Sequence, residues 1–144
     1  MKMIHSNIEI NVSSDTLWDI LLDFNAYPDW NPFITEIYGD TGIGSKLTVT
    51  VRPPDMEPKT FKKVVTMAWD RKQFRWLGRV GIPGLFDGEH MFILEELDPQ
   101  ITRFHQNEVF RGLLVPMFDE TLENTLLGFN EMNKALKERA EKTS

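Results

Sequence analysis

The feature that most constrains the fold is an amphipathic stretch near the C-terminus. Apolar side chains recur there at steps of three or four residues, which is the period of one helix face. They are Phe118, Leu122, Leu126, Phe129, Met132 and Leu136. The pattern predicts one helix from about Pro116 to Ala140, roughly twice the usual helix length. Such a helix is not stable alone in water, so it must lie on a large apolar surface supplied by the rest of the chain.

The remaining sequence predicts that this surface is a sheet. Residues 4–12 alternate between apolar and polar side chains, as in a strand with one wet face. Ser13 and Ser14 can cap a short helix that ends near Phe24, and a turn with two prolines follows at 26–33. Further short strands with turn signals between them then run to Phe110.

Together these elements predict an α+β, helix-grip fold. A curved antiparallel sheet of about seven strands wraps around the long C-terminal helix, and two short helices stand between the first two strands. The sequence contains no internal repeat, low-complexity tract or linker, so residues 1–144 are expected to form a single domain.

Composition excludes several classes of function. The formal net charge is −6 and the pI about 5.1, so binding to nucleic acid or to anionic lipid surfaces is not expected. The sequence has no cysteine, which excludes disulfides, thiolate nucleophiles and cysteine-ligated metals. No apolar run reaches the roughly 18 residues of a membrane span, and the N-terminus does not have the pattern of a signal peptide. We therefore expect a cytoplasmic protein without membrane insertion.

Four segments resemble one known superfamily. Residues 12–21 resemble its opening, a strand end followed by a serine cap and a helix with a tryptophan. Residues 24–33 contain the Tyr-x-x-Trp-Asn-Pro turn common in its bacterial polyketide cyclase-like branch, and residues 84–92 and 106–112 resemble the last two strands of that branch. The chain is thus similar to the START/Bet v 1-like (SRPBCC) superfamily over nearly its whole length. The resemblance implies a cavity between sheet and helix for lipids, sterols or polyketides, with the loop 79–88 near its mouth.

Strand parity, together with the resemblance, selects the side chains that face this cavity. The ten phenylalanines and four tryptophans are a large aromatic content for the chain. The candidate ligand-binding residues are Trp30, Phe33, Phe74, Trp76, His90, Phe92, Phe104, Gln106, Glu108, Phe110, Phe118, Leu122, Leu126 and Phe129. The alternative is that the aromatic side chains fill a dry core. Trp30 in particular is expected to be a packing anchor, and Asn31 to cap a turn.

His90 and Glu108 are predicted to point inward from adjacent strands. They are the candidate catalytic residues, as an acid–base or hydrogen-bonding pair acting on a carbonyl or hydroxyl group of a ligand. The alternative is a structural ion pair, or a Glu108 that turns out to solvent.

Other kinds of site find little support in the sequence. The three histidines lie on different predicted strands without metal-ligand spacing, and there is no phosphate-binding loop or serine triad, so no metal or cofactor is expected. The pairs Lys62-Lys63 and Arg71-Lys72 are interpreted as solvated turns.

Three hypotheses of function remain. The first is a protein that binds a small hydrophobic molecule, such as a lipid or polyketide, in the cavity. The second is an enzyme of polyketide cyclase, aromatase or dehydratase type that uses cavity acid–base residues, without metal or nucleotide cofactor. The third is an interaction module whose apolar loop 79–88 contacts a partner or forms a homodimer. The sequence leaves open whether any reaction is catalysed.

Overall fold

The computed structural model describes residues 1–143, and its elements follow the predicted order. The helices are α1 (Ser14–Leu22), α2 (Tyr27–Trp30) and α3 (Asp119–Thr143), with 3-10 turns η1 (Phe24–Ala26) and η2 (Val115–Phe118). The strands are β1 (Lys2–Ile10), β2 (Ile34–Tyr38), β3 (Lys46–Val51), β4 (Lys59–Trp69), β5 (Gln73–Val80), β6 (Phe86–Asp98) and β7 (Ile101–Arg111).

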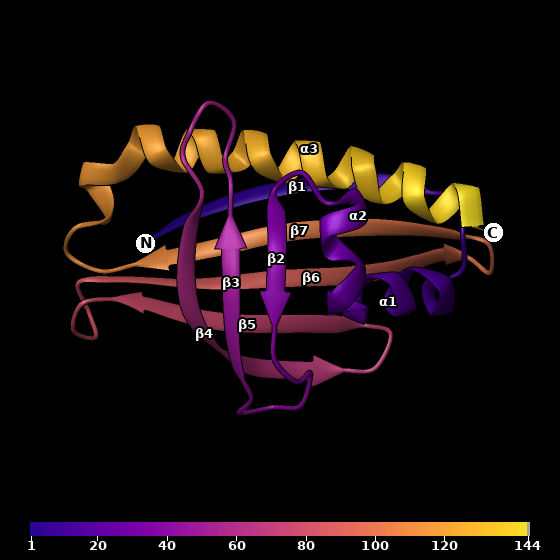
Figure 1. Ribbon diagram of the computed structural model, residues 1–144, viewed down its shortest axis with the longest axis horizontal. Coiled ribbons are helices and arrows are strands. Elements are labelled where there is room, and N and C mark those ends of the chain that lie inside the picture. Colours follow the sequence, from indigo (N-terminus) through magenta and orange to yellow (C-terminus); the bar gives the residue numbers. More distant parts are fainter. Residues whose placement is uncertain (144) are drawn as a thin grey trace.

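The strands form one seven-stranded antiparallel sheet in the order β1-β7-β6-β5-β4-β3-β2. The sheet curls, and α3 runs along its open side, while α1 and α2 close the end nearest the C-terminus of α3 (Figure 1). This arrangement confirms the predicted helix-grip fold. No helix within residues 1–143 combines the length and apolar character that crossing a bilayer requires.

Local side-chain hydrogen bonds explain where several elements begin. The Ser13 hydroxyl accepts a hydrogen bond of 3.2 Å from the Thr16 amide and caps α1. The Asn31 side-chain oxygen accepts bonds of 3.0 and 2.9 Å from the amides of Phe33 and Ile34, which confirms the predicted turn cap before β2. Helix α3 begins three residues after Pro116, which lies in the 3-10 turn η2, and it continues to Thr143 rather than ending at Ala140.

Two local predictions are wrong. The segment 79–88 is not a loop throughout, because Arg79 and Val80 pair with Asp87 and Phe86, and only residues 81–85 connect the two strands. Residues 62 and 63 are not a turn. They lie inside β4, where alternation places their side chains on opposite faces of the sheet.

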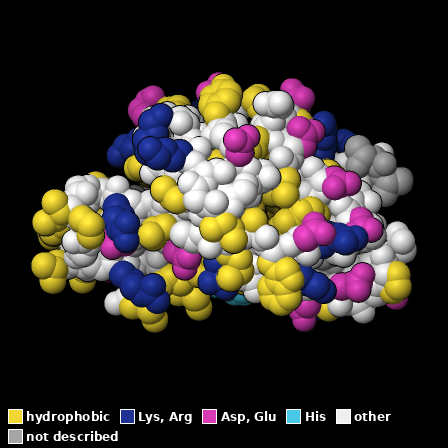
Figure 2. Space-filling view, turned by 90° about the horizontal axis from the view of Figure 1, so that it is seen from below, with side chains coloured by type: hydrophobic (Ala, Val, Ile, Leu, Met, Phe, Trp, Pro, Cys, Tyr) yellow, Lys and Arg dark blue, Asp and Glu magenta, His cyan; other side chains and the backbone are white. Residues whose placement is uncertain are grey.

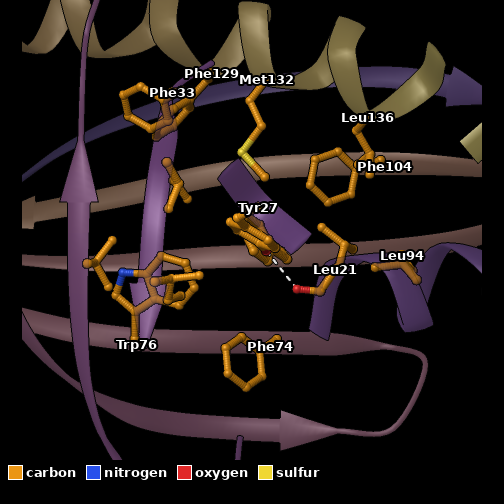
Figure 3. Packing of buried hydrophobic residues seen from close by; sticks show 14 of the residues in the cluster. Leu21, Tyr27, Phe33, Phe74, Trp76, Leu94, Phe104, Phe129, Met132 and Leu136 are labelled. Atoms are coloured by element: carbon orange, nitrogen blue, oxygen red, sulfur yellow. Dashed lines mark hydrogen bonds between the residues drawn. The ribbon is translucent and has the colours of Figure 1, made fainter. Parts of the chain in front are cut away.

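A dense aromatic core fills the end of the molecule that α1 and α2 close. Its fully buried side chains include Leu17, Leu21, Tyr27, Phe74, Phe92, Phe104, Phe129, Met132 and Leu136. Figure 3 shows Leu21, Tyr27 and Phe104 converging beneath α3, with the Tyr27 hydroxyl donating a 2.6 Å hydrogen bond to the Leu21 carbonyl. This end of the space between sheet and helix therefore has no room for a ligand.

Candidate functional site

The other end of the same space holds a cavity of about 290 Å³. It lies between the sheet and the first turns of α3, on the side where the β5–β6 connection and η2 meet. Its wall is Phe33, Ile34, Val49, Val51, Pro53, Met56, Glu57, Lys59, Phe61, Lys63, Trp76, Gly78, Val80, Phe86, Gly88, His90, Glu108, Phe110, Leu114, Phe118, Thr121, Leu122 and Thr125. Most of these side chains are apolar, so the cavity suits the body of an apolar molecule.

The structure divides the predicted site residues between this cavity and the core. Those in the cavity wall are Phe33, Trp76, His90, Glu108, Phe110, Phe118 and Leu122. Those outside the wall are Trp30, Phe74, Phe92, Phe104, Gln106, Leu126 and Phe129. The predicted inward faces of β5, β6 and β7 are confirmed, since the residues chosen there are all buried. Parity alone did not separate the two sets, because both point to the same side of the sheet.

Trp30 lies against Tyr27, with ring centroids 5.3 Å apart, as a packing anchor would. Its indole nitrogen is buried and has no hydrogen-bond partner within residues 1–143.

Sequence reasoning missed the β3 and β4 side of the wall. Lys59, Phe61 and Lys63 share one parity on β4, and all three line the cavity. The alternation that puts Phe61 inward also puts Lys63 inward, so this signal was present in the sequence. It was overlooked because a pair of adjacent lysines suggested a solvated turn.

His90 is held between an aromatic ring and two polar side chains. Its imidazole is stacked on the Trp76 indole, with centroids 4.7 Å apart and planes 10° from parallel. Its Nε2 lies 2.9 Å from Gln106 Oε1, and its Nδ1 lies 3.5 Å from Glu108 Oε1. His90 and Glu108 face each other across β6 and β7, as predicted, and both are buried.

A chain of buried hydrogen bonds connects His90 to α3 and β1. Gln106 Nε2 donates to Asn133 Oδ1 at 3.0 Å and to the Phe129 carbonyl at 3.5 Å. Asn133 Nδ2 donates to Ser6 Oγ at 2.9 Å, and the Ser6 hydroxyl donates to the Gln106 carbonyl at 3.3 Å. Gln106 Nε2 and the Ser6 hydroxyl thus each donate to a backbone carbonyl, and a carbonyl oxygen can only accept a hydrogen bond.

This anchoring fixes the tautomer of His90. The Gln106 atom that faces the Phe129 carbonyl must be the amide nitrogen, so the amide oxygen faces His90. His90 Nε2 therefore carries a hydrogen and donates it to Gln106. A neutral His90 then presents the lone pair of Nδ1 toward Glu108, 3.5 Å from Oε1. An imidazole and a carboxyl group are both acid–base groups, so the pair could serve a ligand in the cavity in that role.

Lys63 brings a third ionisable group to the cavity wall. Burial lowers the pKa of its amine, and the negative charge of Glu108 acts in the opposite direction. The amine lies 4.8 Å from the centre of the Phe61 ring, and it has no hydrogen bond or ion pair with any group in residues 1–143. A polar group of a ligand could therefore contact it without displacing a protein partner.

Apolar side chains are exposed around the cavity end of the molecule. Val80 ends β5, Ile82 belongs to the β5–β6 connection, and Leu113 and Met117 belong to the segment that leads into α3. Their exposed fractions run from 53% to 82%. In the space-filling view, hydrophobic side chains gather at this left-hand end (Figure 2).

Comparison with known proteins gives matches by family and by fold. The model of the family described as "Polyketide cyclase / dehydrase and lipid transport" matches residues 1–141. A START superfamily protein from Mycobacterium smegmatis has 24% identity and a TM-score of 0.76, with 99% of each chain covered. No curated protein matches the sequence.

Two enzymes of known structure share the fold at lower identity. The Zhui aromatase/cyclase from Streptomyces sp. R1128 has 16% identity and a TM-score of 0.75, over 98% of this chain and 94% of that one. Norcoclaurine synthase from Thalictrum flavum, in complex with dopamine and hydroxybenzaldehyde, has 18% identity and a TM-score of 0.72, over 99% and 88%. The family match over residues 1–141 confirms the resemblance to the polyketide cyclase-like branch, and the solved structures share its fold.

Proposed function

Because the chain belongs to the polyketide cyclase/dehydrase and lipid-transport family, we propose that it binds a small apolar molecule in the cavity between the sheet and α3. The observation that carries this proposal is a cavity with a mostly apolar wall and a few polar groups on the sheet side, which are Lys59, Lys63, His90 and Glu108. Such a lining holds an apolar body by burial and orients one polar group, a carbonyl or a hydroxyl, by hydrogen bonding.

A titration with naphthalenemethanol, an apolar alcohol, tests the proposal. Thr125 lines the cavity from α3, so Thr125→Phe should fill part of it and weaken binding by about tenfold or more. Leu127→Phe is the matched control on the same helix, because Leu127 is 52% exposed and outside the wall. Equal affinity of the two variants and the wild type would place the ligand elsewhere, and no binding of any apolar probe would refute the proposal.

The second candidate function is catalysis of cyclase or dehydratase type. The hydrogen-bond chain from Ser6 to His90 favours it, because an imidazole with a fixed tautomer beside a carboxyl group suits proton transfer to a bound keto group. Replacing His90 with Ala and Glu108 with Gln should abolish turnover of a poly-keto substrate while leaving binding in place. Turnover that survives in both variants would leave only the binding function.

We also propose that the exposed apolar side chains at the cavity end form a contact between two copies of the chain. Their position beside the cavity mouth supports this, since exposed apolar patches mark interfaces. Sedimentation at several concentrations should show a dimer that Ile82→Ser together with Leu113→Ser dissociates, and a monomer at all concentrations would exclude it. The cytoplasmic location stays a prediction from the cysteine-free sequence, which cell fractionation would check.

A further inference from the structure

Two glycines create a gap in the side-chain layer beside the cavity. Gly78 on β5 and Gly88 on β6 are cross-strand partners, and Lys63 on β4 pairs with Gly78 from the other side. The Lys63 amine occupies the space that a Cβ at position 78 would need, and Glu108 Oε2 lies 2.6 Å from the place of a Cβ at position 88. Both side chains therefore lie over the glycine pair, and their charged ends approach from opposite sides.

The Lys63 amine combines three properties of a nucleophile. It lies in the wall of an apolar cavity, it has no hydrogen-bond partner within the described chain, and burial lowers its pKa, so a larger share of it is the neutral amine. Glu108 reaches the same glycine pair from β7, and its Oε1 lies 3.5 Å from His90 Nδ1, so two acid–base groups share the cavity wall with Lys63.

The charges on the wall decide which ligand group would suit this amine. A carboxylate would be repelled by Glu108, whose negative charge acts on Lys63. A neutral carbonyl group meets no such repulsion, and its carbon is the electrophile that an amine attacks. We propose that Lys63 forms an imine with an aldehyde or ketone whose apolar body fills the cavity. This inference rests on the proposed binding function and names a chemical class of ligand for the same cavity.

The reaction balances without an oxidant or a cofactor. The Lys63 nitrogen attacks the carbonyl carbon, a C–N bond forms, and a proton moves from nitrogen to oxygen to give a carbinolamine. The nitrogen lone pair then forms the C=N bond as the C–O bond breaks, and the hydroxyl leaves as water with a proton supplied by the Glu108–His90 pair. The nitrogen returns its remaining proton to the same pair. The product is the imine of Lys63, and addition of water reverses each step.

Reductive trapping with naphthaldehyde and sodium cyanoborohydride tests the proposal. The hydride reduces the imine to a stable secondary amine, which increases the mass of the modified peptide by that of the aldehyde less one oxygen atom. We expect Lys63 to be modified about tenfold faster than the other lysines, because the cavity holds the aldehyde beside it. Naphthalenemethanol should compete and slow the modification.

Lys62 provides the matched control within the same strand. Its side chain lies on the opposite face, exposed, with its amine bonded to Thr48 at 2.8 Å. Lys62→Arg should leave the trapping unchanged, whereas Lys63→Arg, which keeps the charge but loses the nucleophile, should abolish it. Gly78→Ala should also abolish it, since the added Cβ takes the place of the Lys63 amine.

The outcomes separate this inference from the function on which it rests. Equal modification of all lysines, or trapping that persists in Lys63→Arg at the wild-type rate, overturns the imine. If naphthalenemethanol binds but the aldehyde does not modify Lys63, the imine is refuted and the binding function stands. If neither compound binds in the cavity, both proposals fail. Circular dichroism of each variant shows whether the fold is retained, and the Lys63→Arg result is decisive if Gly78→Ala does not fold.

Discussion

His90 lies flat against Trp76, with ring centroids 4.7 Å apart, and both residues line the cavity. The stacking holds the imidazole edge toward Glu108 and Gln106, on adjacent strand β7. It also places an indole, whose fluorescence responds to its surroundings, beside the polar groups that a ligand would contact.

Trp76 should therefore report on ligand binding. We expect naphthalenemethanol to change the intrinsic fluorescence of the wild type, and Trp76→Phe to remove most of this change. Trp69→Phe is the control, because Trp69 is 58% exposed at the end of β4 and outside the cavity wall. A change of the same size in Trp76→Phe would mean that the ligand lies at another site.

The hydrogen-bond chain should contribute to stability through Asn133. Asn133→Ala leaves the buried Gln106 amide and Ser6 hydroxyl each without one partner, and we expect a loss of about 1–3 kcal/mol in the free energy of unfolding. Urea denaturation measures it, with Lys134→Ala, an exposed neighbour on α3, as a control expected to change stability by less than about 0.5 kcal/mol.

The same variant should also disturb His90. Nitrogen chemical shifts of the imidazole are expected to show a hydrogen on Nε2 in the wild type. In Asn133→Ala the Gln106 amide is held only by its longer, 3.5 Å bond to the Phe129 carbonyl, so the population of the other tautomer should rise. A wild-type His90 with its hydrogen only on Nδ1 would contradict the direction of the chain.

Gly128 should be required for packing rather than for helix geometry. A Cβ at this position would clash with the Phe33 ring, including Cε1 at 2.6 Å, and Phe33 is itself packed edge-on against Phe129 at 5.6 Å. Gly128→Ala gains helix propensity yet should lower stability by about 1–2 kcal/mol in urea denaturation. Asn130→Ala, at an exposed position of α3, should gain the propensity without the clash, and a stabilising Gly128→Ala would show that Phe33 can move aside.

Tyr27 should make the protein less stable at alkaline pH. Its hydroxyl is buried and donates to the Leu21 carbonyl, and burial raises the pKa of this phenol above its ordinary value. Because the pKa is higher in the folded state than in the unfolded state, this contribution to stability is complete below about pH 10 and is lost as the pH rises further.

Thermal unfolding as a function of pH measures the effect of Tyr27. Tyr27→Phe should be less stable by about 1 kcal/mol near neutrality, because it lacks the hydrogen bond. Above pH 10 its stability should fall less steeply than that of the wild type. Tyr38→Phe, at an exposed position, is the control that should keep the wild-type slope.

The helices, the strands and the faces that they bury could be predicted from local sequence patterns. The spacing of Leu122, Phe129 and Leu136 follows the helix period, and the alternation through His90, Phe92 and Leu94 follows the strand period. These periods are local properties of helix and strand geometry, so the sequence shows which side chains share a face. The apolar face of the helix and the apolar face of the sheet are then expected to bury each other. The strands and the two helices before β2 were predicted from their own patterns and turn signals, and the inward direction of His90 and Glu108 from strand parity together with the resemblance to the superfamily.

Which part of the enclosed space is filled by side chains and which part is empty depends on how the elements pack in three dimensions. Trp18, Leu21 and Tyr27 come from α1 and α2 and fill one end with Phe74 and Phe104, while the other end encloses the cavity. Periodicity tells which side of a strand a residue faces, but not how far away the opposite surface lies. The position of Lys63 over Gly78 depends on the register of β4 and β5, and the contact of Gln106 with Asn133 depends on where α3 lies on the sheet. No local sequence pattern specifies either of these.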